Sequence, residues 1–426
     1  MRNFDTYPLP GEKQARLLQW IVGILGILFF LNCFTPLRLH YDMLRYFSIK
    51  DCMESKCPPG ADPNDYLPIG YTALLLLFSK LGILKSFSLV FVNCLYLAGG
   101  LYFVRKIFRY IRSPFFLFIL VLLNWTIIKF VMHPLSELQY MFFSLASLYA
   151  YCQFVLNKKI RNLVLALLLA GVAFLTRTIG IVLVAALFSA LIWEYRKQLA
   201  GLIRKNRILL GVFALLIVLL IIFSRQLGLN HYLSAIPRQF QGGLRFSDVL
   251  VWHFSEWGEI LINAPRVKAG TMLPVPYGDW IFFVFGLLGI CVFIYICFIK
   301  KNNIPFIVKA YLLFYILLIF NWPFPDPRFW VPVIPLLAAV IGQSPPSQNR
   351  IVKILSTLFF LVYSAFGLIA LSYLTYTSFN KKEFSKTQAM GVYRNEYEVH
   401  FFGKTLSDTA KRVDSNLVHL LNRYDK

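Results

Sequence analysis

Long apolar runs alternate with short basic clusters along almost the whole chain. Most runs have about the 20 residues that a helix needs to cross a bilayer, so the pattern predicts an all-α polytopic membrane protein. On this criterion we expect about eleven transmembrane helices, at residues 17–35, 87–104, 114–132, 138–156, 162–176, 178–195, 208–225, 280–299, 304–322, 329–343 and 351–375.

The basic clusters set the expected orientation, because Lys and Arg accumulate in cytoplasmic loops. Such clusters lie at 105–112, 158–161, 196–207, 300–301 and 350–353. They place the N-terminal segment 1–16 in the cytoplasm, ahead of a multi-pass membrane domain over 17–375. An odd number of spans puts a short extracytoplasmic tail at 376–426. The expected outer loops are a first loop over 36–86, with interfacial helices, and a middle loop over 226–279.

The apolar stretch 66–82 does not fit this scheme as a span. Counting it would move the basic cluster at 105–112 to the outer face, against the positive-inside rule. It is also short for a full crossing. We therefore expect it to lie along the interface or to re-enter, with an ordinary short span as the alternative.

Composition agrees with the membrane class and excludes a soluble domain. Of 426 residues, 58% are hydrophobic and 17% aromatic, which leaves too few polar residues for a solvated shell. The net charge of +23 is spread over short clusters between apolar runs, so topology explains it better than nucleic-acid binding. The lipid bilayer is the expected partner, and no nucleic acid is expected.

Two of the seven cysteines, Cys52 and Cys57, share the first outer loop. A local disulfide forms there if the compartment is oxidising, and free thiols are the alternative. A zinc site is not expected, because nothing near His40 completes a set of four ligands. The chain also lacks a phosphate loop, a dinucleotide fingerprint and a nucleophile elbow.

Four charged positions are expected near the same outer face: Asp42, Glu137, Arg177 and Arg328. A carboxylate can accept the proton of an attacking hydroxyl, and a guanidinium can hold a phosphate and neutralise a departing one. This is the equipment for moving a group off a lipid phosphate. Each residue also has a structural alternative: anchoring at a helix end for the arginines, a helix N-terminal acid for Glu137, and a solvated loop acid for Asp42.

The order of these features resembles the C-type glycosyltransferases, integral-membrane enzymes that use polyprenyl-phosphate sugar donors and include the dolichyl-phosphate-mannose and aminoarabinose transferases. The resemblance covers about residues 15–340. It rests on the following segments: Asp42-Met-Leu-Arg-Tyr46, Tyr66-Leu-Pro-Ile-Gly-Tyr71, Glu137 at the start of a span, Phe174-Leu-Thr-Arg177-Thr-Ile-Gly180, and Arg328-Phe-Trp-Val-Pro-Val-Ile-Pro335.

The resemblance implies a role for each of these residues. Asp42 is the expected catalytic base, Glu137 positions substrate, and Arg177 and Arg328 face the donor phosphate. His40, Tyr46 and Tyr66 are further substrate-positioning candidates. Tyr46, Tyr66, Trp252 and Trp257 offer aromatic faces for sugar rings, or else anchor the protein at the lipid headgroups.

The chain departs from better-known members in two respects. Neither Asp42 nor Glu137 has an adjacent second acid, so no paired-acid motif supports a divalent metal. We therefore expect no cofactor, with a divalent metal as the alternative. A tail of about 50 residues (376–426) stands where relatives carry a large soluble domain. We therefore expect inverting transfer of one sugar to a lipid-linked or surface glycan, on the non-cytoplasmic face. The bacterial inner membrane is the default location and the endoplasmic reticulum the alternative.

Two other classes remain open from the sequence. A transporter or flippase of lipid-linked glycans also combines many spans with a few charges. Transporters, however, place polar groups near the bilayer midplane, whereas the expected charges here lie at one surface. The third class is an inactive scaffold subunit, which would be indicated if Asp42 and Arg328 lay far apart.

Overall fold

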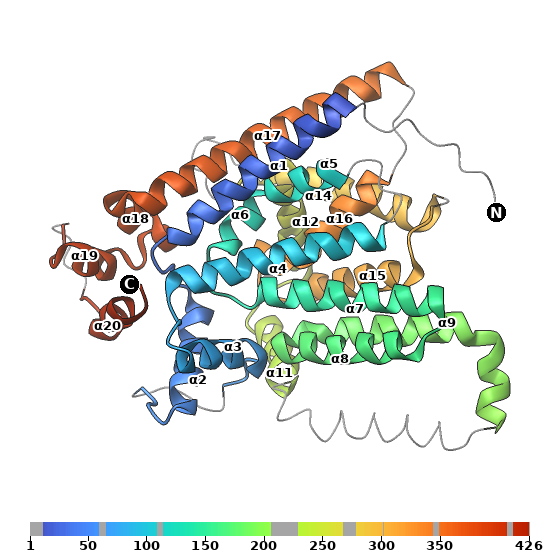
Figure 1. The fold of residues 1–426 in the computed structure, drawn as a ribbon, viewed down its shortest axis with the longest axis horizontal. Coiled ribbons are helices and arrows are strands. Elements are labelled where there is room, and N and C mark those ends of the chain that lie inside the picture. The colour runs from blue at the N-terminus through green and yellow to red at the C-terminus, as the bar shows by residue number, and fades with distance from the viewer. Residues whose placement is uncertain are drawn as a thin grey trace.

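The computed structural model describes residues 12–58, 65–108, 114–205, 229–266, 278–300, 302–343, 349–406 and 412–425. Within these ranges the chain is helical and contains no β-strand (Figure 1). The helices are α1 (Glu12–Leu31), α2 (Tyr41–Met53), α3 (Ile69–Lys80), α4 (Ser86–Ile107), α5 (Pro114–Leu122), α6 (Trp125–Val131), α7 (Glu137–Asn157), α8 (Ile160–Thr176), α9 (Ile181–Lys205), α11 (Leu229–Gln241), α12 (Phe246–Ile262), α14 (Gly278–Ile294), α15 (Phe306–Phe320), α16 (Ile334–Gly342), α17 (Arg350–Phe379), α18 (Lys381–Thr387), α19 (Arg394–Phe402) and α20 (Ser415–Tyr424), with short η turns that include η1 (Asn32–Phe34) and η4 (Pro327–Trp330).

Five described helical segments are long and apolar enough to cross a membrane: Arg16–Phe34, Ser86–Ile107, Thr178–Arg196, Trp280–Ile299 and Arg350–Phe379. Their outward-facing apolar side chains, such as Leu95 of α4 and Ile369 of α17, are exposed, as expected for surfaces that face lipid. The all-α class is therefore confirmed for the described residues, and the five apolar helices are compatible with a multi-pass membrane protein. The larger count of eleven spans stays a prediction, and the span expected at 208–225 lies outside the described residues.

The span expected at 114–132 is interrupted. Helix α5 ends at Leu122, and Asn124 caps α6 by accepting hydrogen bonds from the backbone N–H groups of Thr126 and Ile127. The side chain of Asn263 donates to the free carbonyl of Leu123 at 2.8 Å. Non-helical backbone is tolerated among apolar helices only where partners of this kind form hydrogen bonds with its N–H and C=O groups.

Two glycines allow helices α12 and α14 to cross in close contact. A Cβ atom at Gly286 would lie 1.7 Å from the carbonyl oxygen of Phe254, and one at Gly258 would lie 1.8 Å from that of Phe282. Only glycine permits this backbone approach, which is a common way to pack helices inside membranes.

The helix ends that carry the first loop and the tail gather at one end of the body, at the left of Figure 1. Helices α2 and α3 lie there, together with the tail helices α18, α19 and α20. Side chains join the two groups, since the Tyr424 hydroxyl of α20 accepts a hydrogen bond from Lys50 of α2 at 2.8 Å. The tail is therefore built onto the first loop.

Helix α3 spans 12 residues, which is shorter than the ~20 needed for a crossing. It packs against α8 at Gly70, where an added Cβ would lie 2.7 Å from the carbonyl oxygen of Leu175. The short helix agrees with the interfacial or re-entrant reading of 66–82, whose position in a bilayer stays a prediction.

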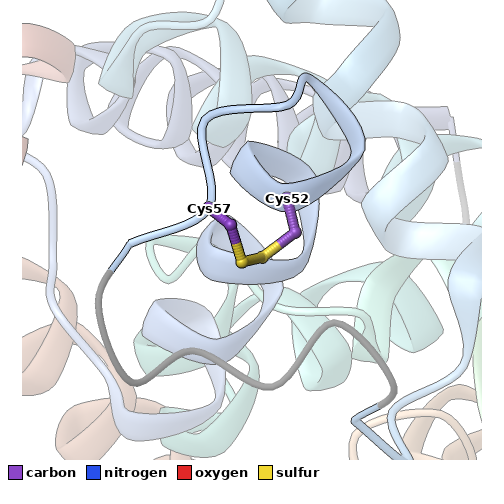
Figure 2. Close-up of a disulfide and its surroundings, with 2 residues drawn as sticks. All are labelled: Cys52 and Cys57. Atoms are coloured by element: carbon purple, nitrogen blue, oxygen red, sulfur yellow. A yellow bond between two sulfur atoms is a disulfide. The ribbon is translucent and has the colours of Figure 1, made fainter.

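A disulfide joins Cys52 and Cys57, the pair that the sequence left open (Figure 2). Cys52 lies in the last turn of α2, and Cys57 follows in the loop. The bond therefore ties the end of α2 to the chain that leads toward Asp65 and Tyr66.

We predict that Gly286→Ala destabilises the protein by about 1–3 kcal/mol, because the new methyl group forces α12 and α14 apart. Thermal unfolding of purified protein in detergent measures the change. Gly171→Ala in α8 is the matched control, since no atom of the described residues lies within 4 Å of its added Cβ. Equal melting temperatures for the two variants would contradict the close crossing.

Candidate functional site

Asp42 stands in the first turn of α2, directly after an extended segment. His40 precedes the helix as its N-cap, and its Nδ1 atom accepts a hydrogen bond from the Asp42 backbone N–H at 3.2 Å. An acid in the first turn is favoured by the helix dipole. This local structure fixes where the Asp42 carboxylate points.

Arg328 lies on η4 and meets Asp42 directly. Its Nη2 atom is 2.6 Å from Oδ2 of Asp42. Asp326 caps the same turn by accepting from the Arg328 backbone N–H at 3.0 Å, and its Oδ2 atom is 2.8 Å from Nε of Arg328. The late chain segment is thereby joined to the first loop.

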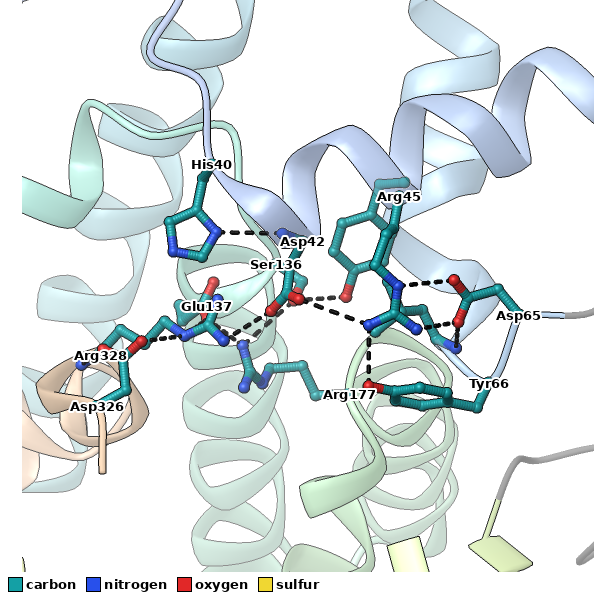
Figure 3. Close-up of polar contacts among 12 residues, drawn as sticks. His40, Asp42, Arg45, Asp65, Tyr66, Ser136, Glu137, Arg177, Asp326 and Arg328 are labelled. Carbon is teal, nitrogen blue, oxygen red and sulfur yellow. Dashed lines mark hydrogen bonds and ion pairs between the residues drawn. The ribbon is translucent and has the colours of Figure 1, made fainter. Parts of the chain in front are cut away.

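Glu137 and Arg177 complete the same network (Figure 3). Glu137 opens α7 and its side chain is 1% exposed, and it forms an ion pair with Arg177, which ends α8. Nε of Arg328 lies 3.8 Å from Oε1 of Glu137. The structure thus brings together all four charged residues that the sequence singled out.

A second group lines the opposite side of Asp42. Arg45 lies 3.7 Å from Oδ1 of Asp42 through its Nη1 atom. Asp65 accepts two hydrogen bonds from the same guanidinium, and the Tyr66 hydroxyl accepts a third at 2.9 Å. The Arg45 guanidinium also stacks over the Tyr66 ring, with its carbon 4.2 Å from the ring centre.

The protonation states follow from this arrangement. Burial is the strongest single influence and raises the pKa of Asp42, but the neighbouring groups, Arg328 foremost among them, together outweigh it, so the pKa lies below its usual value. Burial, helped by Arg328, lowers the pKa of His40. At neutral pH the resting site therefore holds an ionised Asp42 and a neutral His40.

The aromatic expectations are revised for two residues. Tyr46 is only 3% exposed; its ring meets Tyr71 edge to face, with ring centres 5.0 Å apart, and its hydroxyl lies 3.0 Å from that of Ser136. It supports the network from behind and has no free face for a sugar. Trp257 is also buried, against Trp330 at 5.4 Å between ring centres, so it cannot sit in a headgroup belt.

A buried polar group behind η4 was not anticipated. Residues 246–262 of the expected middle loop form α12, on which Nδ1 of His253 lies 2.8 Å from a Glu256 oxygen. That same oxygen accepts from the Trp330 indole N–H at 2.7 Å. These contacts hold Trp330, which lies two residues after Arg328 on the same turn. The signal in the sequence was a His and an acid three positions apart in an apolar helical pattern.

The tail clamps the segment before Asp42, which sequence reasoning also missed. The Tyr397 hydroxyl donates to the Leu37 carbonyl at 2.5 Å and accepts from the Leu39 N–H at 2.9 Å. The Gln388 side chain donates to the Leu39 carbonyl at 3.3 Å. Arg38 is buried and donates to Ser378 at 2.8 Å. Residues 37–40 are therefore held in their extended form by the tail.

Among the residues that the structure describes, no group of three or more His, Cys, Asp or Glu side chains could hold a metal ion. No protein-family model matches the chain, and no characterised protein or solved structure shows a significant similarity to it. The functional argument therefore depends on the geometry of this site.

We predict that Tyr397→Phe loosens residues 37–40, because both of its backbone hydrogen bonds are lost from a buried position. The cost should be about 1–3 kcal/mol. Hydrogen–deuterium exchange of peptides covering 37–44 should rise while exchange in α7 stays unchanged. Tyr102→Phe, an exposed tyrosine of α4, is the control. Unchanged exchange at 37–44 in Tyr397→Phe would contradict a clamping role for the tail.

Proposed function

We propose that this protein is a membrane glycosyltransferase that moves a single sugar from a polyprenyl-phosphate donor to a hydroxyl of a lipid-linked or surface glycan, with inversion. The observation that carries the proposal is the direct contact between Asp42 and Arg328, inside a network that also holds Glu137 and Arg177. The proposed base, Asp42, and the two guanidiniums proposed to bind phosphate lie close enough together for one sugar phosphate to contact all three.

In this proposal, binding of the donor phosphate releases Asp42, the base, from its ion pair with Arg328. The resting Asp42 is a weak base because it is paired with Arg328. A donor phosphate competes for the Arg328 guanidinium, with which it forms charge-assisted hydrogen bonds. Asp42 then loses the contact that lowered its pKa, while burial, which raises the pKa, still acts. The carboxylate becomes a stronger base when the donor is in place.

The transfer step follows from these positions. Asp42 takes the proton of the acceptor hydroxyl as its oxygen forms a bond to the anomeric carbon. The bond between that carbon and the phosphate oxygen breaks, and its electron pair stays on the lipid phosphate. Arg328 and Arg177 stabilise the negative charge that develops there. Attack opposite the leaving group inverts the anomeric configuration.

Glu137 and His40 have supporting roles in this scheme. The Glu137 carboxylate holds Arg177 and approaches Arg328, so it sets the spacing of the two guanidiniums. His40 caps α2 and fixes the direction of Asp42. Both act as positioning residues.

Transport of lipid-linked glycans is less well supported. The charged residues Asp42, Glu137, Arg177 and Arg328 lie where helices begin or end, and they gather in one network (Figure 3). A translocation path needs polar groups spread toward the midplane. Eleven spans, a site on the non-cytoplasmic face and a bacterial inner membrane complete the proposal.

We predict that Asp42→Asn abolishes sugar transfer but leaves folding intact, because asparagine fills the same space and cannot accept the proton. The measurement is transfer from radiolabelled polyprenyl-phosphate sugars to membrane glycans, a loss of at least about 10²-fold being expected for a missing general base. Binding of polyprenyl phosphate should not weaken, since the competitor for Arg328 has lost its charge. Substantial remaining transfer would remove Asp42 as the base.

We predict that Arg328→Gln weakens binding of undecaprenyl phosphate by about 10- to 100-fold, since a charge-assisted contact is worth about 1.5–3 kcal/mol. Binding is measured by intrinsic fluorescence of the protein in nanodiscs. Lys158→Gln is the control, because Lys158 forms an exposed ion pair with Glu194 at the far end of α7. Equal affinities for both variants would contradict a donor-phosphate role for Arg328.

A further inference from the structure

The two carboxylate oxygens of Asp42 face different sides of the site. Oδ2 contacts Arg328 at 2.6 Å, on the side of the proposed donor phosphate. Oδ1 faces Arg45 at 3.7 Å. In an in-line displacement the acceptor hydroxyl approaches from the side opposite the leaving group. The Arg45 side of Asp42 is therefore where an acceptor would arrive.

The charge of Arg45 is already compensated. Asp65 accepts two of its N–H hydrogen bonds, and Tyr66 accepts a third (Figure 3). A guanidinium held bidentately by a carboxylate is a poor site for a further anion, because binding one would require breaking that pair. Arg328 differs, because Asp42 holds it through a single oxygen, at 2.6 Å, which one phosphate can replace. Its buried Nη1 atom also has no hydrogen-bond partner among the residues that the structure describes. The two sides of Asp42 thus differ in the charge they can accept.

An exposed aromatic ring lies beside the paired guanidinium of Arg45. Tyr41, the residue before Asp42, is 67% exposed, and the Arg45 guanidinium carbon lies 5.7 Å from its ring centre. Tyr41 was not singled out by the sequence, whereas Tyr46, which was, is buried. Aromatic faces flanked by fixed hydrogen-bonding groups suit ligands with one apolar face and a hydroxylated edge. Sugar rings have this character.

We infer that Tyr41, Arg45 and Tyr66 form an acceptor subsite that takes a neutral sugar ring of a glycan and excludes phosphorylated or carboxylated sugars. The ring lies on Tyr41, and its reacting hydroxyl donates its proton to Oδ1 of Asp42. This inference rests on the proposed transferase function, because the acceptor side is defined relative to the donor phosphate.

The test uses the full-length protein in nanodiscs, applied to an array of immobilised neutral and acidic oligosaccharides. Wild type should bind neutral glycans, and Tyr41→Ala should bind them about tenfold more weakly, a loss of about 1.4 kcal/mol. Tyr41→Phe should keep the affinity, because the ring face is retained. Tyr102→Ala removes another exposed tyrosine, on α4, and should match wild type.

A preference for acidic glycans, equal binding by Tyr41→Ala, or no glycan binding by wild type would each overturn the subsite. Binding of undecaprenyl phosphate separates this failure from failure of the proposed function. Tyr41→Ala should bind that lipid as wild type does. If undecaprenyl phosphate does not bind at all while neutral glycans bind through Tyr41, the transferase proposal fails and the glycan site stands.

Discussion

A charge that is buried beside apolar helices must be paired with an opposite charge. At Arg328 this requirement brings together segments that are far apart in the chain. Its guanidinium meets Asp42 from the first loop, Asp326 from its own turn and Glu137 from the start of α7. An unpaired charge at such a position would cost several kcal/mol. Segments far apart in the sequence are therefore held at one end of the body, and the arrangement of α2, α7 and η4 there depends on keeping these ions compensated.

The two backbone segments that carry Asp42 and Arg328 are each held in place by a separate part of the structure. The tail fixes the backbone before Asp42 through Tyr397, whose hydroxyl bridges Leu37 and Leu39. The turn that carries Arg328 is fixed through Trp330, which donates to Glu256 on α12. Neither anchor touches the proposed reacting atoms. They fix the separation of Asp42 and Arg328 in advance, which would lower the reorganisation needed by the proposed reaction.

The sequence predicted the helical class and the members of the charged site because both have strong local signals. Apolar runs of bilayer length predict helices, and a charge at the edge of such a run is rare enough to indicate function. The roles of Tyr397 and Glu256 could not be predicted in this way, since they depend on contacts with residues distant in the chain. The exposed aromatic face expected of Tyr46 was wrong for a related reason. An aromatic residue on a short helix can face inward or outward, and its packing against Tyr71 determines which way Tyr46 faces. Asn124 shows the same limit, because its side chain donates to the carbonyl of Ile260, which lies on the distant helix α12.

Under the proposed function, the charge balance of the site would couple the state of the base to binding of the donor. Around the centre, two guanidiniums (Arg177 and Arg328) face three carboxylates (Asp42, Glu137 and Asp326). In the proposed function, an incoming phosphate would enter a site without excess positive charge, and it would gain a cation only by displacing a carboxylate. Glu137 is the most deeply buried of the three, at 1% exposure, and Asp326 is tied to its own turn as the cap. Asp42 is the remaining carboxylate, so in the proposed reaction exchange of anions on Arg328 would free the acid that is proposed to accept the proton.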